Sequence, residues 1–273
     1  RRAAAAVPSN VGLNPLKGVV VKYYLKEAND STKVTIDIVD DQNKVIKTYS
    51  SKDKGGPEVE QGFNQFAWNL YHKEIDKPES SLIFWNGTTS PVLAAPGKYK
   101  AKVTIDKSVS EWPFEILPDP NFKTSAADLK AQEQFLLDVA GKFDEIMKAL
   151  KTIKEVRSQI NAIQSKTKDS AFAKLCGTIL KDLTTVEEAL HQTKAKSGQD
   201  VLNFPIRLDD KLAGIFESAA AGYVAPTKQV VAAFEELKGQ TNTQLSKLEK
   251  IKNEDLKQLN ALVHTLSIPV IGN

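Results

Sequence analysis

The spacing of apolar residues changes once along the chain, at Pro118-Asp119-Pro120. From Gly18 to about Leu117, apolar residues recur at every second position, which is the period of a β-strand with one buried face. After the break they recur every three to four positions, which is the period of an amphipathic helix. The sequence therefore predicts an α+β protein of two domains, with strands first and helices second.

The N-terminal half contains several short segments with the strand pattern. They are residues 19–25, 33–39, 44–49, 64–70, 98–105 and 112–116. On the second of them, Val34, Ile36 and Ile38 share one face, and the turn residues 40–44 join it to the third as a hairpin. Six or seven short strands in about 100 residues predict a small antiparallel β-sandwich.

The stretch GFNQFAWNL, residues 62–70, concentrates three aromatic rings and raises the question of a ligand platform. Phe66, Trp68 and Leu70 alternate with Gln65, Ala67 and Asn69, so one apolar face is predicted to point inward. Phe63 falls outside that register, and we expect it to cover a sheet edge. The pattern favours core packing over a platform.

The helical half opens at Ser125-Ala-Ala-Asp128, which has the form of a capping box. The apolar stripes predict helices over about 125–163, 169–192, 205–222 and 227–266, with a bend near Asn253. At 1.5 Å per residue the first and last helices would each span roughly 60 Å, and the middle two together about the same length. Two arrangements fit: a three-layer antiparallel bundle whose middle arm is broken at residues 194–199, or a four-helix bundle. The helix lengths favour the broken arm.

These patterns define the expected domains. We expect an N-terminal tail at 1–13, a β-sandwich at 14–118, a linker at 119–124 and a helical bundle at 125–271. The chain opens on Arg1 with no initiator Met, which predicts that an upstream segment was removed or that the chain is part of a longer one.

The charge pattern does not favour nucleic acid as a partner. The net charge is +3, and among the 37 basic residues Arg occurs at positions 1, 2, 157 and 207, the others being Lys scattered among acids. No run of 18 or more apolar residues occurs, so no membrane span is expected.

Catalytic and metal-binding signatures are missing from the sequence. The histidines, His72, His191 and His264, lack metal-ligand spacing, and Cys176 sits on an apolar stripe. His191 and His264 come late in helices, where a cation interacts favourably with the helix dipole. Adjacent acids such as Asp209 and Asp210 are expected to point apart. The sequence predicts a protein that is not an enzyme, with no catalytic residue, metal or cofactor.

One loop offers a candidate ligand site. Trp85 lies in LIFWNGTTSP and is the best candidate for an exposed ring. With Tyr71 nearby it could stack on a sugar, while Asn86 and His72 could supply hydrogen bonds. Two N-glycosylation sequons, at Asn29 and Asn86, fit a protein outside the cytoplasm.

Several segments resemble one protein family. They are NPLKGVVVKYYLKE (14–27), VTIDIVDDQNKVIKTY (34–49), GFNQFAWNL (62–70), APGKYKAKV (95–103), TSAADLKAQEQFLLDV (124–139), LNFPIRLDDKLAGI (202–215), APTKQVVAAFEEL (225–237) and LNALVHTLSIPVI (259–271). In this order they resemble the C-terminal region of large exported bacterial β-propeller proteins with BNR or sortilin-like repeats, often labelled glycosyl-hydrolase-like. The resemblance covers about residues 13–271.

The resemblance implies an immunoglobulin-like sandwich followed by a helical bundle, in a periplasmic or extracellular protein. It implies a non-catalytic module that braces an upstream β-propeller of the same parent protein or presents a surface to another protein. The alternative is a carbohydrate-binding accessory module of a glycan-processing protein, with the ligand site named above.

Overall fold

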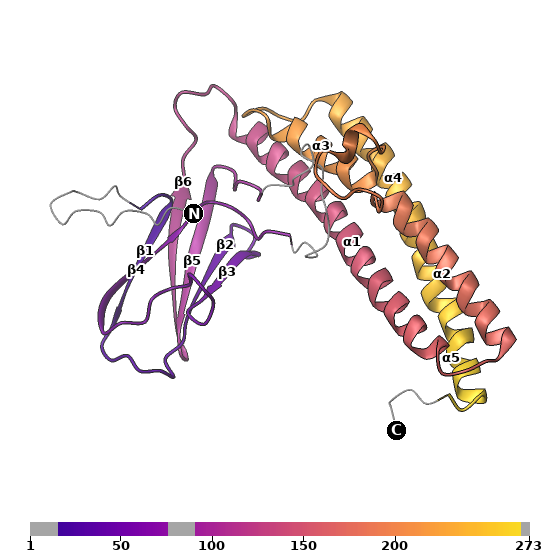
Figure 1. Cartoon of the computed structure of the whole chain (residues 1–273). Helices are drawn as coiled ribbons and strands as arrows, with labels where there is room; N and C mark the ends of the chain where they lie inside the picture. The colour runs from indigo at the N-terminus through magenta and orange to yellow at the C-terminus, as the bar shows by residue number, and fades with distance from the viewer. Residues whose placement is uncertain (1–15, 76–90, 269–273) are drawn as a thin grey trace. The chain divides into compact units, whose positions relative to one another are not determined.

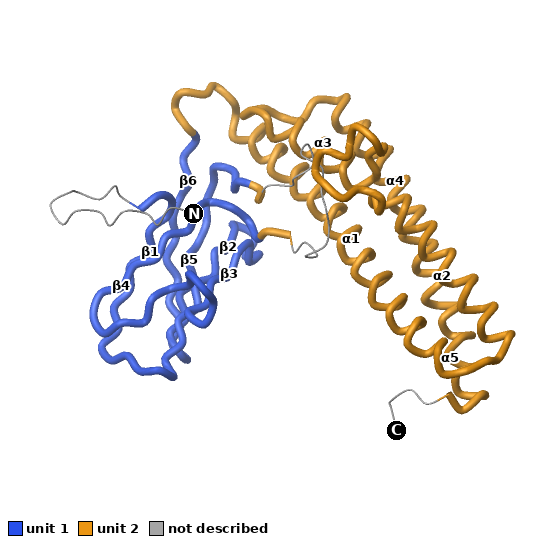
Figure 2. The backbone as a smooth tube through the Cα atoms, in the orientation of Figure 1, with its two compact units in different colours: residues 1–73, 93–118 blue, residues 74–92, 119–273 orange. Residues whose placement is uncertain are grey.

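The computed structural model describes residues 16–75 and 91–268 of the chain. It is an α+β structure, with strands in the N-terminal half and helices after them (Figure 1). The chain divides into two compact units, residues 1–73 with 93–118 and residues 74–92 with 119–273 (Figure 2). We call them the β unit and the helical unit. The division after Pro118 coincides with the change of apolar period.

Two antiparallel sheets make up the described part of the β unit. The strands are β1 (Val19–Leu25), β2 (Val34–Asp40), β3 (Val45–Ser50), β4 (Gly62–Trp68), β5 (Gly97–Ile105) and β6 (Ser108–Ile116). β1 pairs with β4 in one sheet, and the order in the other is β3-β2-β5-β6. The predicted hairpin of β2 and β3 is confirmed. The last strand was predicted too short, because its first half, from Ser108 to Glu111, is exposed and lacks apolar alternation.

Both sheets contribute side chains to a single apolar core. Val34, Ile36 and Ile38 are fully buried, as their shared face predicted. Trp68 is fully buried as well, and its ring lies 5.9 Å from that of Tyr99 on the other sheet. Phe66 and Leu70 pack against the same core, so the inward face predicted for residues 66–70 is confirmed.

The helical unit is built from long helices with side-chain caps. Its elements are α1 (Ala126–Gln164), α2 (Ser170–Leu190), the 3-10 turn η1 (Asp200–Leu202), α3 (Leu208–Ala220), α4 (Lys228–Lys250), the π-helical segment η2 (Ile251–Asp255) and α5 (Leu256–Thr265). The predicted capping of α1 is confirmed, since Ser125 Oγ accepts a hydrogen bond from the Asp128 N–H at 3.1 Å. The bend expected near Asn253 corresponds to η2.

The middle helices follow one another along α1. His191, directly after α2, contacts Asp209 at the start of α3. At the other end of α3, the carbonyl of Ala219 accepts a hydrogen bond at 2.7 Å from Gln132 Nε2, near the start of α1. α2 and α3 therefore form one broken arm antiparallel to α1, which is the arrangement that the helix lengths favoured. The segment α4-η2-α5 returns as the third arm.

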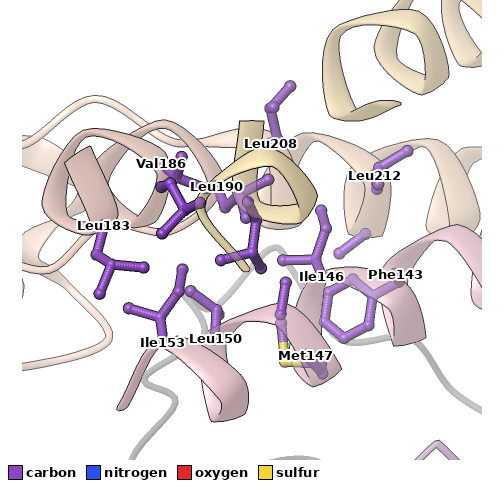
Figure 3. Packing of buried hydrophobic residues seen from close by; sticks show 14 of the residues in the cluster. Phe143, Ile146, Met147, Leu150, Ile153, Leu183, Val186, Leu190, Leu208 and Leu212 are labelled. Atoms are coloured by element: carbon purple, nitrogen blue, oxygen red, sulfur yellow. The ribbon is translucent and has the colours of Figure 1, made fainter. Parts of the chain in front are cut away.

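A continuous apolar core joins these helices (Figure 3). Leu150 and Ile153 of α1 point toward α2, from which Leu183 points back, and all three are buried. Val92 also belongs to this core, and Ile75 packs against it. The predicted sandwich domain 14–118 included these two residues, whereas their contacts place them with the helical unit. Both side chains are apolar and would fit either core, so the sequence does not show which one they join.

Candidate interaction surface

The outward face of the β1–β4 sheet carries exposed apolar side chains. Tyr24 of β1 lies opposite Phe63 of β4, and Val20 lies opposite Ala67. The exposed fractions are 88% for Phe63, 57% for Tyr24 and 38% for Val20. We call Val20, Tyr24 and Phe63 the aromatic face.

The alternation of β4 places Phe63 on this face. Asn64, Phe66 and Trp68 point inward, so Phe63 points to solvent with Gln65. The expectation that Phe63 covers a sheet edge was wrong. The alternation of exposed and buried side chains along β4 already includes Phe63. The sequence does not reveal it, because the buried neighbour of Phe63 is the polar residue Asn64. The Asn64 side chain is buried because it bonds the backbone of Glu60, accepting from its N–H at 3.0 Å and donating to its carbonyl at 2.7 Å.

The rings of Tyr24 and Phe63 contact each other while both remain exposed. The centroids of Tyr24 and Phe63 are 5.0 Å apart, with 63° between the ring planes, which is the edge-to-face geometry that aromatic pairs favour. Exposed Lys22 and Gln65 form the adjacent cross-strand pair. Exposed rings beside polar side chains are the composition of an interface centre with a polar rim.

Another exposed ring lies on the edge strand of the larger sheet. Trp112 of β6 is 65% exposed, although its register partner Ala101 is buried. Pro113 follows it and has no backbone N–H, which disfavours pairing of a further strand at this edge. A cavity of about 540 Å³ lies beside Pro113, and its lining includes Asp40, Lys98, Lys100 and Glu115.

Of the four residues of the predicted ligand site, the structure describes Tyr71 and His72. Trp85 and Asn86 lie outside the described residues. Tyr71 is 37% exposed, and its carbonyl accepts a hydrogen bond from the Trp68 indole N–H at 2.9 Å. His72 is 8% exposed, so these two neighbours do not share one surface. A ligand site at these residues stays a prediction.

The helical unit contains a contact between a part-buried histidine and a buried carboxylate that sequence reasoning missed. His191 Nδ1 lies 2.5 Å from Asp209 Oδ2, and the side chains are 13% and 1% exposed. The sequence predicted only a helix-dipole interaction for His191, and it predicted that Asp209 and Asp210 point apart. Both acids are buried. The partners are 18 residues apart in sequence, so no local spacing could reveal the contact.

The surroundings of His191 favour its protonated form. Burial by itself would lower its pKa, but the hydrogen bond to Asp209 and the charges of Asp209, Asp210 and Glu187 raise the pKa above its ordinary value. Over residues 16–75 and 91–268, no group of three or more His, Cys, Asp or Glu side chains is arranged to hold a metal ion. The arrangement at His191 is that of a structural ion pair.

Comparisons with protein-family models, with curated proteins and with solved structures found no match. They lend no support to the resemblance with the β-propeller proteins, which stays a hypothesis. Among the described residues, no helix is both long and apolar enough to cross a membrane.

Proposed function

We propose that this chain is a non-catalytic interaction module whose β unit docks on another folded domain through the aromatic face. The observation that carries the proposal is Phe63, a large apolar side chain that is 88% exposed on a regular strand beside exposed Tyr24. Burying a Phe side chain stabilises a complex by roughly 1.5–3 kcal/mol. A partner that covers both rings would be bound more tightly for this reason, and the two rings would act as the aromatic anchors that are common in interfaces.

We further propose that the partner is an upstream β-propeller and that the two sheets form an immunoglobulin-like sandwich. Two antiparallel sheets around one core, followed by a helical unit, support this proposal because they occur in the order that the resemblance implies. A periplasmic or extracellular location belongs to the same proposal.

The test uses the segment encoded directly upstream of Arg1, purified and titrated with this chain. We expect binding that weakens at least tenfold in the double variant Tyr24→Ser/Phe63→Ser. The matched control is Val109→Ser, which removes an apolar side chain that is 52% exposed on β6 of the other sheet. Absence of binding, or equal losses in both variants, would reject the proposal.

A carbohydrate-binding accessory module is the second proposal. The observation in its favour is Trp112, a large aromatic side chain that is 65% exposed on β6. Sugars stack on exposed aromatic planes. On a glycan array, wild-type protein should bind at least one glycan, and Trp112→Ala should lose that signal while Phe63→Ser keeps it. Absence of binding to every glycan on the array would contradict this proposal.

A further inference from the structure

The connection between α2 and α3 is closed at its base by two side-chain contacts. His191 Nδ1 contacts Asp209 Oδ2 at 2.5 Å, and Gln192 Nε2 donates to the carbonyl of Pro205 at 2.9 Å. The chain between these contacts, residues 193–204, therefore begins and ends at nearly the same place. We call residues 192–206 the α2–α3 loop.

The α2–α3 loop has little apolar burial of its own. Every residue from 193 to 207 is at least partly exposed, and Leu202 is 82% exposed. Its internal bonds are local, such as those from the N–H groups of Lys196 and Ser197 to Asp200 Oδ2 at 2.6 and 3.1 Å. A segment without its own core has low local stability, so its closure depends on the base contacts.

Acidic groups from two helices face His191. Asp209 and Asp210 lie in the first turn of α3, and Glu187 lies in the last turn of α2. Arg157 of α1 binds the Glu187 carboxylate through both of its terminal nitrogens, at 3.2 and 2.6 Å. Asp209 is 1% exposed, so its carboxylate is compensated by His191 and by the Asp210 N–H, which donates to Oδ1 at 2.8 Å, in place of water.

We propose that His191 and Asp209 form a proton-dependent latch, which holds the α2–α3 loop closed while His191 is protonated and loosens when the proton is lost. A neutral imidazole can still donate a hydrogen bond from Nδ1, so the contact weakens without disappearing. Loss of the proton removes the positive charge of His191, so the buried Asp209 would lie near Asp210 and Glu187 against a neutral imidazole, which is unfavourable.

The direction of the pH effect follows from linkage. The acids raise the pKa of His191 in the closed loop above its value in an open loop. The latch is therefore at full strength below about pH 6.5, the ordinary pKa of His, and loosens as pH rises through the higher pKa of the closed state. The opening equilibrium should increase about tenfold for each unit of difference between the two pKa values.

Hydrogen exchange of the full chain, measured by mass spectrometry from pH 5.5 to 9 and corrected for intrinsic exchange, tests the proposal. We expect protection of amides 193–204 in wild type to fall at least threefold across this range while α1 amides stay unchanged. His191→Asn keeps a donor near the Nδ1 position but cannot titrate, so its protection should not depend on pH. His264→Asn is the control, because His264 is exposed on α5.

Wild-type protection that stays constant with pH, or the same pH dependence in His191→Asn, would overturn the latch. If His191→Asn does not fold, NMR titration of the wild-type imidazoles decides instead. A His191 pKa above about 6.5, the ordinary value of His, supports the proposal, and an equal or lower value overturns it.

Discussion

Tyr24 and Phe63 lie directly opposite each other on β1 and β4, with ring centroids 5.0 Å apart and exposed fractions of 57% and 88%. The pair is on the face that does not contact the core of the β unit. Its rings therefore contribute little to folding, while they offer apolar area to a partner. The predicted effects of substitution on stability and on binding differ accordingly.

Phe63→Ser should lower the free energy of unfolding by only about 1 kcal/mol, the typical contribution of one aromatic pair. The measurement is urea unfolding of the β unit followed by hydrogen exchange of strand amides. A loss above about 3 kcal/mol would mean that Phe63 is covered in solution, contrary to the exposure seen here.

Trp68→Phe should destabilise the β unit by about 1–3 kcal/mol. The variant leaves a void in the core and deprives the Tyr71 carbonyl of its hydrogen bond from the indole N–H, which is 2.9 Å long. The same exchange measurement applies. Trp112→Phe is the matched control, because Trp112 is 65% exposed, and it should change stability by less than about 0.5 kcal/mol.

Cys176 should resist thiol reagents in the native protein. It is fully buried between helices, and burial raises the pKa of its thiol, so the reactive thiolate is scarce. Labelling should become complete only when urea unfolds the helical unit, and its midpoint should match the loss of helical circular dichroism. Complete labelling within minutes in native buffer would contradict the buried position.

Arg157→Lys should destabilise the packing of α1 on α2 by about 1 kcal/mol. Lysine cannot reproduce the two contacts of the guanidinium with Glu187, and the partial exposure of both side chains limits the loss. The midpoint of thermal unfolding of the helical unit measures it. Lys250→Gln is the control, since Lys250 and Glu254 are exposed and 3.9 Å apart, and it should be neutral.

The sequence predicted those features that depend on neighbouring residues. The burial of Val34, Ile36 and Ile38 follows from a period of two, and the start of α1 follows from the Ser125 cap. These signals are local, because side-chain direction along a strand and capping of a first turn are decided within a few residues.

Contacts between distant segments could not be predicted in this way. The pair His191–Asp209 depends on how α2 and α3 meet after a long connection, and Val92 joins a core made by helices that begin more than 30 residues later. The exposure of Phe63 depends on which face of the β1–β4 sheet the rest of the fold covers. Each of these features results from tertiary packing, which the apolar periodicity of a single sequence does not reveal.

The most direct test of the proposed function is site-specific photo-crosslinking of this chain in its native cell. A photoreactive phenylalanine analogue at position 63 should give a crosslink to a folded domain, which the proposal takes to be a β-propeller and which mass spectrometry identifies. The same analogue at Glu111, exposed on the other sheet, should give none. Equal yields at the two positions, or no crosslink from position 63, would contradict docking through the aromatic face.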